Sequence, residues 1–86
     1  MKRVNMARND NMDYTAELFS QRLLIRMGEM DMSQKQLASL LGVHINTVGN
    51  WIYGKSEPGI SMFSRLVIIL RTTPDWLLGL EDIPWM

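Results

Sequence analysis

The sequence predicts a compact all-α domain of five helices. Apolar residues recur at spacings of three and four along most of the chain, which is the period of an amphipathic helix. Glycine, proline and capping residues separate these stretches, and no alternating pattern typical of a strand interrupts them. The 86 residues, 47% of them hydrophobic, suffice for one modest core. We therefore expect a single domain, with limits at about 15–80.

The first helix is predicted from Ala16 to about Met30, with Thr15 as its N-cap. Its apolar stripe is Phe19, Leu23, Met27 and Met30. Residues 1–14 show no apolar period, and we predict that they form a flexible arm. This arm is either solvated, which we favour, or inserted in a minor groove through its basic residues Lys2, Arg3 and Arg8.

The second helix is predicted to start after Ser33, because Ser33 and Gln36 form the Ser-x-x-Gln pattern of a capping box. Gly42 ends it, since glycine adopts the left-handed conformation of a helix end at little cost. The side chains expected to face the core are Leu37, Leu40 and Leu41, with Ala38 as a small contact surface.

A third helix is predicted from Ile45 to about Tyr53, after a connection of only a few residues, and Gly54 stops it. Its apolar face is Val48, Trp51 and Ile52. Two helices joined by a short turn containing glycine form a helix-turn-helix, here at about 34–53, although an ordinary helical hairpin is the alternative. In a helix-turn-helix Ala38 has to be small where the helices cross, and Val48 lies between them.

A fourth helix is predicted over about 60–71 and a fifth over about 74–78. Pro58 fixes the loop before the fourth helix, whose apolar face is Phe63, Leu66, Val67 and Leu70. Thr73, Pro74 and Asp75 combine a cap, a first-turn proline and an acid near the positive helix end. Gly79 ends the fifth helix, and residues 81–86 form a short apolar tail.

The charges are unevenly distributed, although the net charge is zero. From Met32 to Ser56 the chain has no Asp or Glu but contains Lys35 and Lys55. A surface that faces phosphates needs such an acid-free stretch, whereas the alternative is chance clustering of neutral polar residues.

Composition excludes several other classes of protein. The chain has no cysteine and one histidine, His44, so disulfides and clustered metal ligands are not expected. No apolar run reaches the roughly 20 residues of a membrane span, and no secretory core follows the first charges. No nucleophile–base pattern suggests an enzyme. We expect a cytoplasmic protein without cofactor or small-molecule ligand.

The face of the third helix opposite its apolar side carries Ile45, Asn46, Gly49 and Asn50. This set, called the ridge below, is short-chained and uncharged. It can enter a major groove, where asparagine pairs with adenine N6 and N7 and isoleucine contacts a thymine methyl. The alternative is a solvated surface.

The chain resembles the lambda repressor/Cro-type, or XRE, family of helix-turn-helix proteins over about Phe19–Leu80. The matching motifs are Ser33-Gln34, Leu37-Ala38, Leu41-Gly42-Val43, Thr47-Val48, Trp51, Gly54-Lys55, Pro58 and Pro74-Asp75-Trp76-Leu77-Leu78-Gly79. The resemblance implies a five-helix domain that binds operator DNA, commonly as a symmetric dimer, and represses transcription.

The resemblance also implies roles for individual residues. Gln34, at the start of the second helix, corresponds to a residue that holds a phosphate. Ile45, Asn46 and Asn50 take base-reading positions, and Gly49 permits close approach. The candidates for contacts with the DNA backbone are Ser33, Gln34, His44, Thr47, Tyr53, Lys55 and Ser56.

Three departures from the family pattern are visible. His44 stands where Ser or Thr is common, so it caps the third helix more weakly, or contacts phosphate itself. Met27 and Ile52 replace an Arg–Glu pair, and we hypothesise that an apolar contact substitutes for the ion pair. The third helix has no Arg or Lys, which implies modest affinity and a shallow dependence on salt.

Two matters stay open at this level. Trp76, Leu80, Ile83 and Trp85 either close the core or form a self-complementary dimer patch, which we favour slightly. The second functional hypothesis is a protein-interaction module of the same fold, such as an anti-repressor or an antitoxin. We expect control by abundance, because the chain has no room for a separate effector domain.

Overall fold

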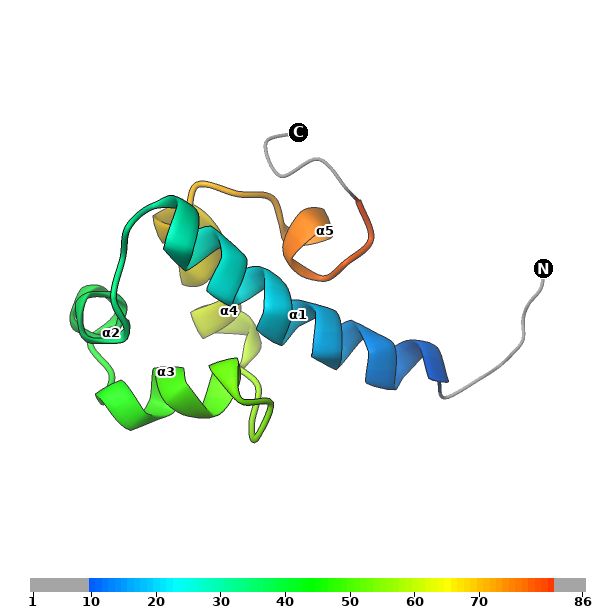
Figure 1. Ribbon diagram of the computed structural model, residues 1–86, viewed down its shortest axis with the longest axis horizontal. Coiled ribbons are helices and arrows are strands. Elements are labelled where there is room, and N and C mark those ends of the chain that lie inside the picture. Colours follow the sequence, from blue (N-terminus) through cyan, green and yellow to red (C-terminus); the bar gives the residue numbers. More distant parts are fainter. Residues whose placement is uncertain (1–9, 82–86) are drawn as a thin grey trace.

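The five predicted helices are present, and the fold is all-α. The structure is a computed structural model that describes the backbone of residues 10–81 and the side chains of residues 15–81. All regular structure within this range is helical (Figure 1). The helices are α1 (Asp10–Glu29), α2 (Gln34–Leu41), α3 (Ile45–Ile52), α4 (Ile60–Ile69) and α5 (Pro74–Leu77).

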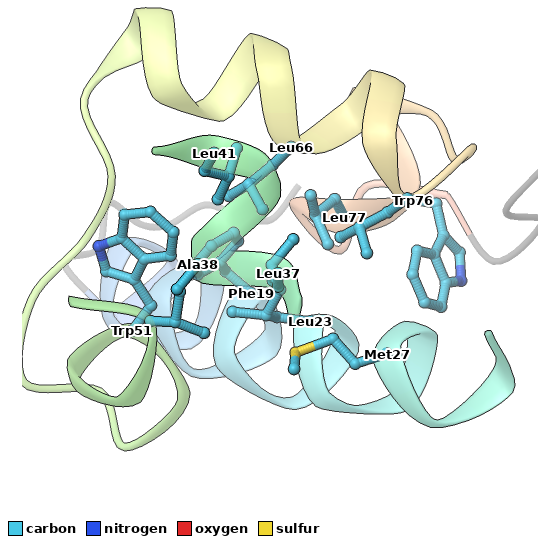
Figure 2. Close-up of a cluster of buried hydrophobic side chains, with 12 residues drawn as sticks. Phe19, Leu23, Met27, Leu37, Ala38, Leu41, Trp51, Leu66, Trp76 and Leu77 are labelled. Carbon is cyan, nitrogen blue, oxygen red and sulfur yellow. The ribbon is translucent and has the colours of Figure 1, made fainter. Parts of the chain in front are cut away.

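One hydrophobic core holds the helices together. Every helix contributes to it, and Figure 2 shows these side chains converging between α1 and α4. The buried residues are Phe19, Leu23, Met27, Leu37, Ala38, Leu41, Val48, Trp51, Leu66, Leu70, Trp76 and Leu77. Burying one such leucine stabilises the fold by about 1.5–3 kcal/mol relative to leaving it in water. The stripe predicted for the first helix is confirmed, with Met30 half-buried at its end.

The start of α1 differs from the prediction. The helix begins at Asp10, so Thr15 lies within it and is not its N-cap. The prediction rested on the lack of an apolar period before Thr15. That period reports which face is buried, whereas the backbone stays helical as long as no breaker intervenes, and residues 10–15 contain no glycine or proline. The rest of the predicted arm, residues 1–9, lies outside the described residues.

The ends of α2 confirm the capping signals. The Ser33 hydroxyl accepts a hydrogen bond from the Gln36 N–H at 3.1 Å, and the Gln36 side chain accepts one from the Ser33 N–H at 2.8 Å. Gly42 has a left-handed φ of 74°. Leu37 and Leu41 are buried as predicted, but Leu40 is 55% exposed. Its inward placement was wrong because α3 crosses α2 on the side of Leu37, Ala38 and Leu41.

Two arginines of α1, one turn apart, bind the carboxyl ends of the last two helices. Arg26 donates from Nε to the Leu70 carbonyl at 2.7 Å and from Nη2 to the Arg71 carbonyl at 3.1 Å. Arg22 donates from Nη1 to the carbonyls of Trp76 and Glu81, and its guanidinium lies 5.1 Å from the centroid of the Trp76 ring. These contacts satisfy terminal carbonyls and place positive charge at the negative ends of the helices.

Trp76 belongs to the core of the single chain. It follows the Thr73 cap, whose hydroxyl accepts a hydrogen bond from the Trp76 N–H at 3.1 Å, and it is 6% exposed. This is the core-closing role that the sequence had left open for it. Leu80 is 68% exposed, while Ile83 and Trp85 lie outside the described residues.

Candidate nucleic-acid interface

The buried side of α3 anchors this helix to the hydrophobic core. Val48 is fully buried and Trp51 is 3% exposed. The Ser20 hydroxyl of α1 donates a 2.7 Å hydrogen bond to the Trp51 carbonyl, which ties the last turn of α3 to α1. Met27 and Ile52 both belong to the hydrophobic cluster, and their direct contact stays a prediction. The opposite face of α3 is therefore held in a fixed orientation.

The ridge is open to solvent on that opposite face. Ile45 is 41% exposed, Asn46 and Asn50 are exposed, and Gly49 is half-buried. The four residues occupy successive turns on one side of α3, as the helical period requires. The two asparagine side chains of the ridge are thus accessible to solvent, whereas Gly49 between them is partly covered.

Gln34 connects the start of α2 with the ridge. The side chain is half-buried, and its Nε2 lies 3.5 Å from the position that a Cβ on Gly49 would take. A Cβ at this position would thus make an ordinary van der Waals contact with the Gln34 amide, which lies beside α3. The Gln34 amide at the start of α2 therefore lies beside Gly49 of the ridge.

His44 is the N-cap of α3. Its Nδ1 accepts a hydrogen bond from the Asn46 N–H at 3.0 Å, and its backbone is extended. The ring is exposed, so it performs the capping role and still borders the ridge. The cap holds the backbone of Asn46 while leaving the Asn46 side chain exposed.

The remaining backbone-contact candidates border both ends of the two helices. Ser33 is exposed at the start of α2, and Thr47 is half-buried on α3. Tyr53 ends α3 and is 74% exposed. The N–H groups of Lys55 and Ser56 both donate to the Asn50 carbonyl, at 2.8 and 3.3 Å, so the loop turns back against the end of α3. Tyr53 also lines a recess against α1, and the other candidates lie at the ends of α2 and α3 or on α3 itself.

Carboxylates near this stretch in sequence point elsewhere in space. Asp31 lines a recess on the outer side of α2 together with Lys35 and Leu40. Glu57 lines a groove with Phe19 and Phe63, away from the ridge. Lys35 and Lys55 are exposed. Neither carboxylate shares a recess with a ridge residue, whereas Glu17 of α1 shares one with Tyr53 and Gly54 at the end of α3.

Two kinds of feature are absent from the described residues, a cluster of metal ligands and a membrane-spanning helix. No group of three or more His, Asp or Glu side chains in this part of the chain could hold a metal ion. None of the helices in the same range is long and apolar enough to span a membrane.

The sequence analysis did not predict the side-chain hydrogen bonds that hold the helices in position. The hydroxyl of Ser20 and the guanidinium groups of Arg22 and Arg26 bind backbone carbonyls 31 to 59 positions away. A carbonyl has no sequence signature, so no pattern marked these partners. The only available signal was the position of Arg22 and Arg26, four residues apart and each adjacent to a predicted core residue.

Comparison with known families identifies the helix-turn-helix region. A family model described as Helix-turn-helix matches residues 23–77. This range covers more than half of the chain and includes all of α2 and α3 and therefore the whole ridge. Comparisons with curated proteins and with solved structures gave no significant match.

Proposed function

Since this chain belongs to the helix-turn-helix family, of the XRE or lambda repressor/Cro-like type, we propose that it is a transcriptional repressor that binds a near-palindromic operator as a dimer. That it is a DNA-binding regulator follows from the family, whose members are generally not enzymes. The proposal has four further parts: the protein represses transcription, it acts as a dimer, it acts in a bacterial or phage-infected cytoplasm, and it needs no small ligand.

The exposed ridge on a rigidly held α3 carries this proposal. Amides on Asn46 and Asn50 can each pair with an adenine edge, and Ile45 suits a thymine methyl. Gln34, His44 and Lys55 border the same face, where they would hold phosphates and fix the register. A protein placed on its operator in this way blocks access of polymerase.

In vitro selection from random duplexes tests the proposal. We expect enrichment of two related half-sites whose centres lie about one helical turn, or 10–10.5 base pairs, apart. A reporter gene carrying the selected site should then lose expression. Failure to enrich any sequence at low salt would contradict DNA reading, whereas increased expression would contradict repression.

A protein-interaction module of the same fold is the competing function. The zero net charge and the lack of any cation on α3 favour it, because phosphate neutralisation supplies most non-specific affinity. Such a module would bind no duplex above background at any salt concentration and would form a stable complex with a protein partner. The selection experiment separates the two functions.

A further inference from the structure

An open apolar groove lies between α1, α4 and the end of α5, away from the ridge. Its volume is about 480 Å³. Phe19 and Phe63 face each other in it, with ring centroids 6.1 Å apart and planes tilted by 48°. The apolar lining residues are Ala16, Phe19, Pro58, Ile60, Phe63 and Leu78. Among the described residues that line the groove, Glu57 is the one with a charged side chain. A groove of this composition favours an apolar occupant.

Ile60 projects from the rim of this groove into solvent. It is the first residue of α4 and is 90% exposed, more than any other large hydrophobic side chain among residues 15–81. Ile60 lies beside the groove without filling it, so the same face presents both an apolar projection and an apolar recess. Two copies related by a two-fold axis can exchange these features, since such an interface uses the same patch on both copies.

We propose that this face is the surface through which two copies of the chain pair, with Ile60 of each copy seated in the groove of the other. The inference rests on the proposed function, which needs a dimer, and it names the surface that forms it. It moves the pairing surface away from Trp76, which is buried within the single chain.

The position of the groove is compatible with DNA binding. Glu57 and Pro58, which line it, belong to the loop that follows α3, so the groove lies beyond the carboxyl end of α3. None of the four ridge residues lines it. A second copy docked there leaves both ridges open, as reading of two successive half-sites requires.

The test compares Ile60→Gln with Ile68→Gln in the full chain. Ile68 is a matched control, because it lies on the same helix, is 72% exposed and does not line the groove. Sedimentation velocity over a range of concentrations should show at least a tenfold higher dimer dissociation constant for Ile60→Gln and no change for Ile68→Gln. At concentrations low enough for all three chains to be monomers, circular dichroism should show the same melting temperature for both variants as for the parent.

A cross-linking experiment tests the contact itself. The chain has no cysteine, so single cysteines can be introduced without background. A mixture of Ile60→Cys and Leu78→Cys chains of different mass should form the mixed disulfide on mild oxidation, whereas Ile68→Cys with Leu78→Cys should not.

The proposal is overturned if the parent chain is monomeric at all concentrations, with or without operator DNA, as expected if its own tail fills the groove. It is also overturned if Ile60→Gln dimerises like the parent. Binding to a duplex with a single half-site, measured in parallel, tests DNA reading separately. Retained half-site binding by Ile60→Gln would show that only pairing was lost.

Discussion

Asn46 and Asn50 combine a donor and an acceptor on a short side chain, which is what the adenine edge requires in the major groove. Both amides extend from a helix whose other side is locked by Val48 and Trp51, so the backbone that carries them needs no further ordering when they bind. The capping bond from the Asn46 N–H to His44 Nδ1 fixes the backbone at the first of them. In the proposed function, base reading would depend on rigid placement of these amides and not on charge.

A substitution at Gly49 should change DNA affinity and thermal stability in opposite directions. Alanine in the middle of a helix is more stable than glycine by about 0.5–1 kcal/mol. A Cβ at position 49 would lie 3.5 Å from Gln34 Nε2, an ordinary contact that the fold accepts but that restricts the amide. We therefore predict that Gly49→Ala raises the melting temperature and weakens binding to the selected duplex about tenfold, the equivalent of roughly 1.4 kcal/mol. Thermal melts and fluorescence anisotropy check the two effects.

Two results would contradict this interpretation of Gly49. Unchanged DNA affinity would mean that the Gln34 amide needs no room beside α3. A lower melting temperature would mean that position 49 is more crowded than a 3.5 Å contact implies. Ser39→Ala, on the exposed side of α2, is the control and should change DNA affinity little.

For single residues, the sequence predicted burial correctly where burial follows from local periodicity. Leu37, Val48 and Trp51 are buried as their spacing predicts. Leu40 was placed wrongly because the same spacing allows it to face either way, and only the crossing of α3 decides which. Met27 and Ile52 join one cluster, yet two apolar side chains can share a core without touching, so their contact needs a structural test.

At the level of the helices, arginines on α1 act as caps for other elements. The Arg26 side chain is 21% exposed, and its hydrogen bonds reach the carbonyls of Leu70 and Arg71 at the end of α4. Its ion pair with Glu29, at 3.1 Å, is more exposed and contributes little. Most of the stabilisation by Arg26 thus comes from capping.

Removing this cap should destabilise the fold. We predict that Arg26→Ala lowers the free energy of unfolding by about 1–2 kcal/mol, because charged hydrogen bonds to two terminal carbonyls are lost at a partly exposed site. Urea denaturation followed by circular dichroism measures the change. Arg65→Ala, at an exposed position of α4, should change it by less than about 0.5 kcal/mol. Equal effects of the two substitutions would contradict the capping role.

Helix boundaries were predictable where the residues that end or cap the helix are close together in the sequence. The Ser33–Gln36 box, the left-handed Gly42 and the Thr73 cap all act over three or four residues, and all three are present. The start of α1 was missed because the sequence before Thr15 shows no apolar period to indicate a helix. The arginine caps were missed because they join elements that only the tertiary fold brings together.

Across the whole molecule, the few cations near the ridge set the strength of non-specific binding. Two exposed lysines belong to this part of the chain: Lys55 lies in the loop after α3, and Lys35 lies on the outer side of α2, in the recess that Asp31 also lines. Helix α3 itself carries no charge. We predict that the slope of log affinity against log salt for one protomer on a half-site is about −2, because each neutralised phosphate contributes about −0.9. Lys55→Gln should reduce the slope by about one.

The salt dependence also distinguishes the two states proposed for the residues before α1. A solvated arm leaves the slope near −2, whereas an arm bound through Lys2, Arg3 and Arg8 would bring it to about −5. Affinity measured over a range of potassium chloride concentrations decides between them. The steeper slope would contradict our preference for a solvated arm.

The most direct test of base reading by the ridge compares Asn46→Ala with the parent on the selected duplex and on an unrelated duplex of equal length. Loss of one bidentate amide contact should reduce the ratio of specific to non-specific affinity by about 10- to 100-fold. Non-specific affinity and melting temperature should stay unchanged. An unaltered ratio for the folded variant would show that DNA sequence is not read through this residue, and the ridge would lose its assigned function.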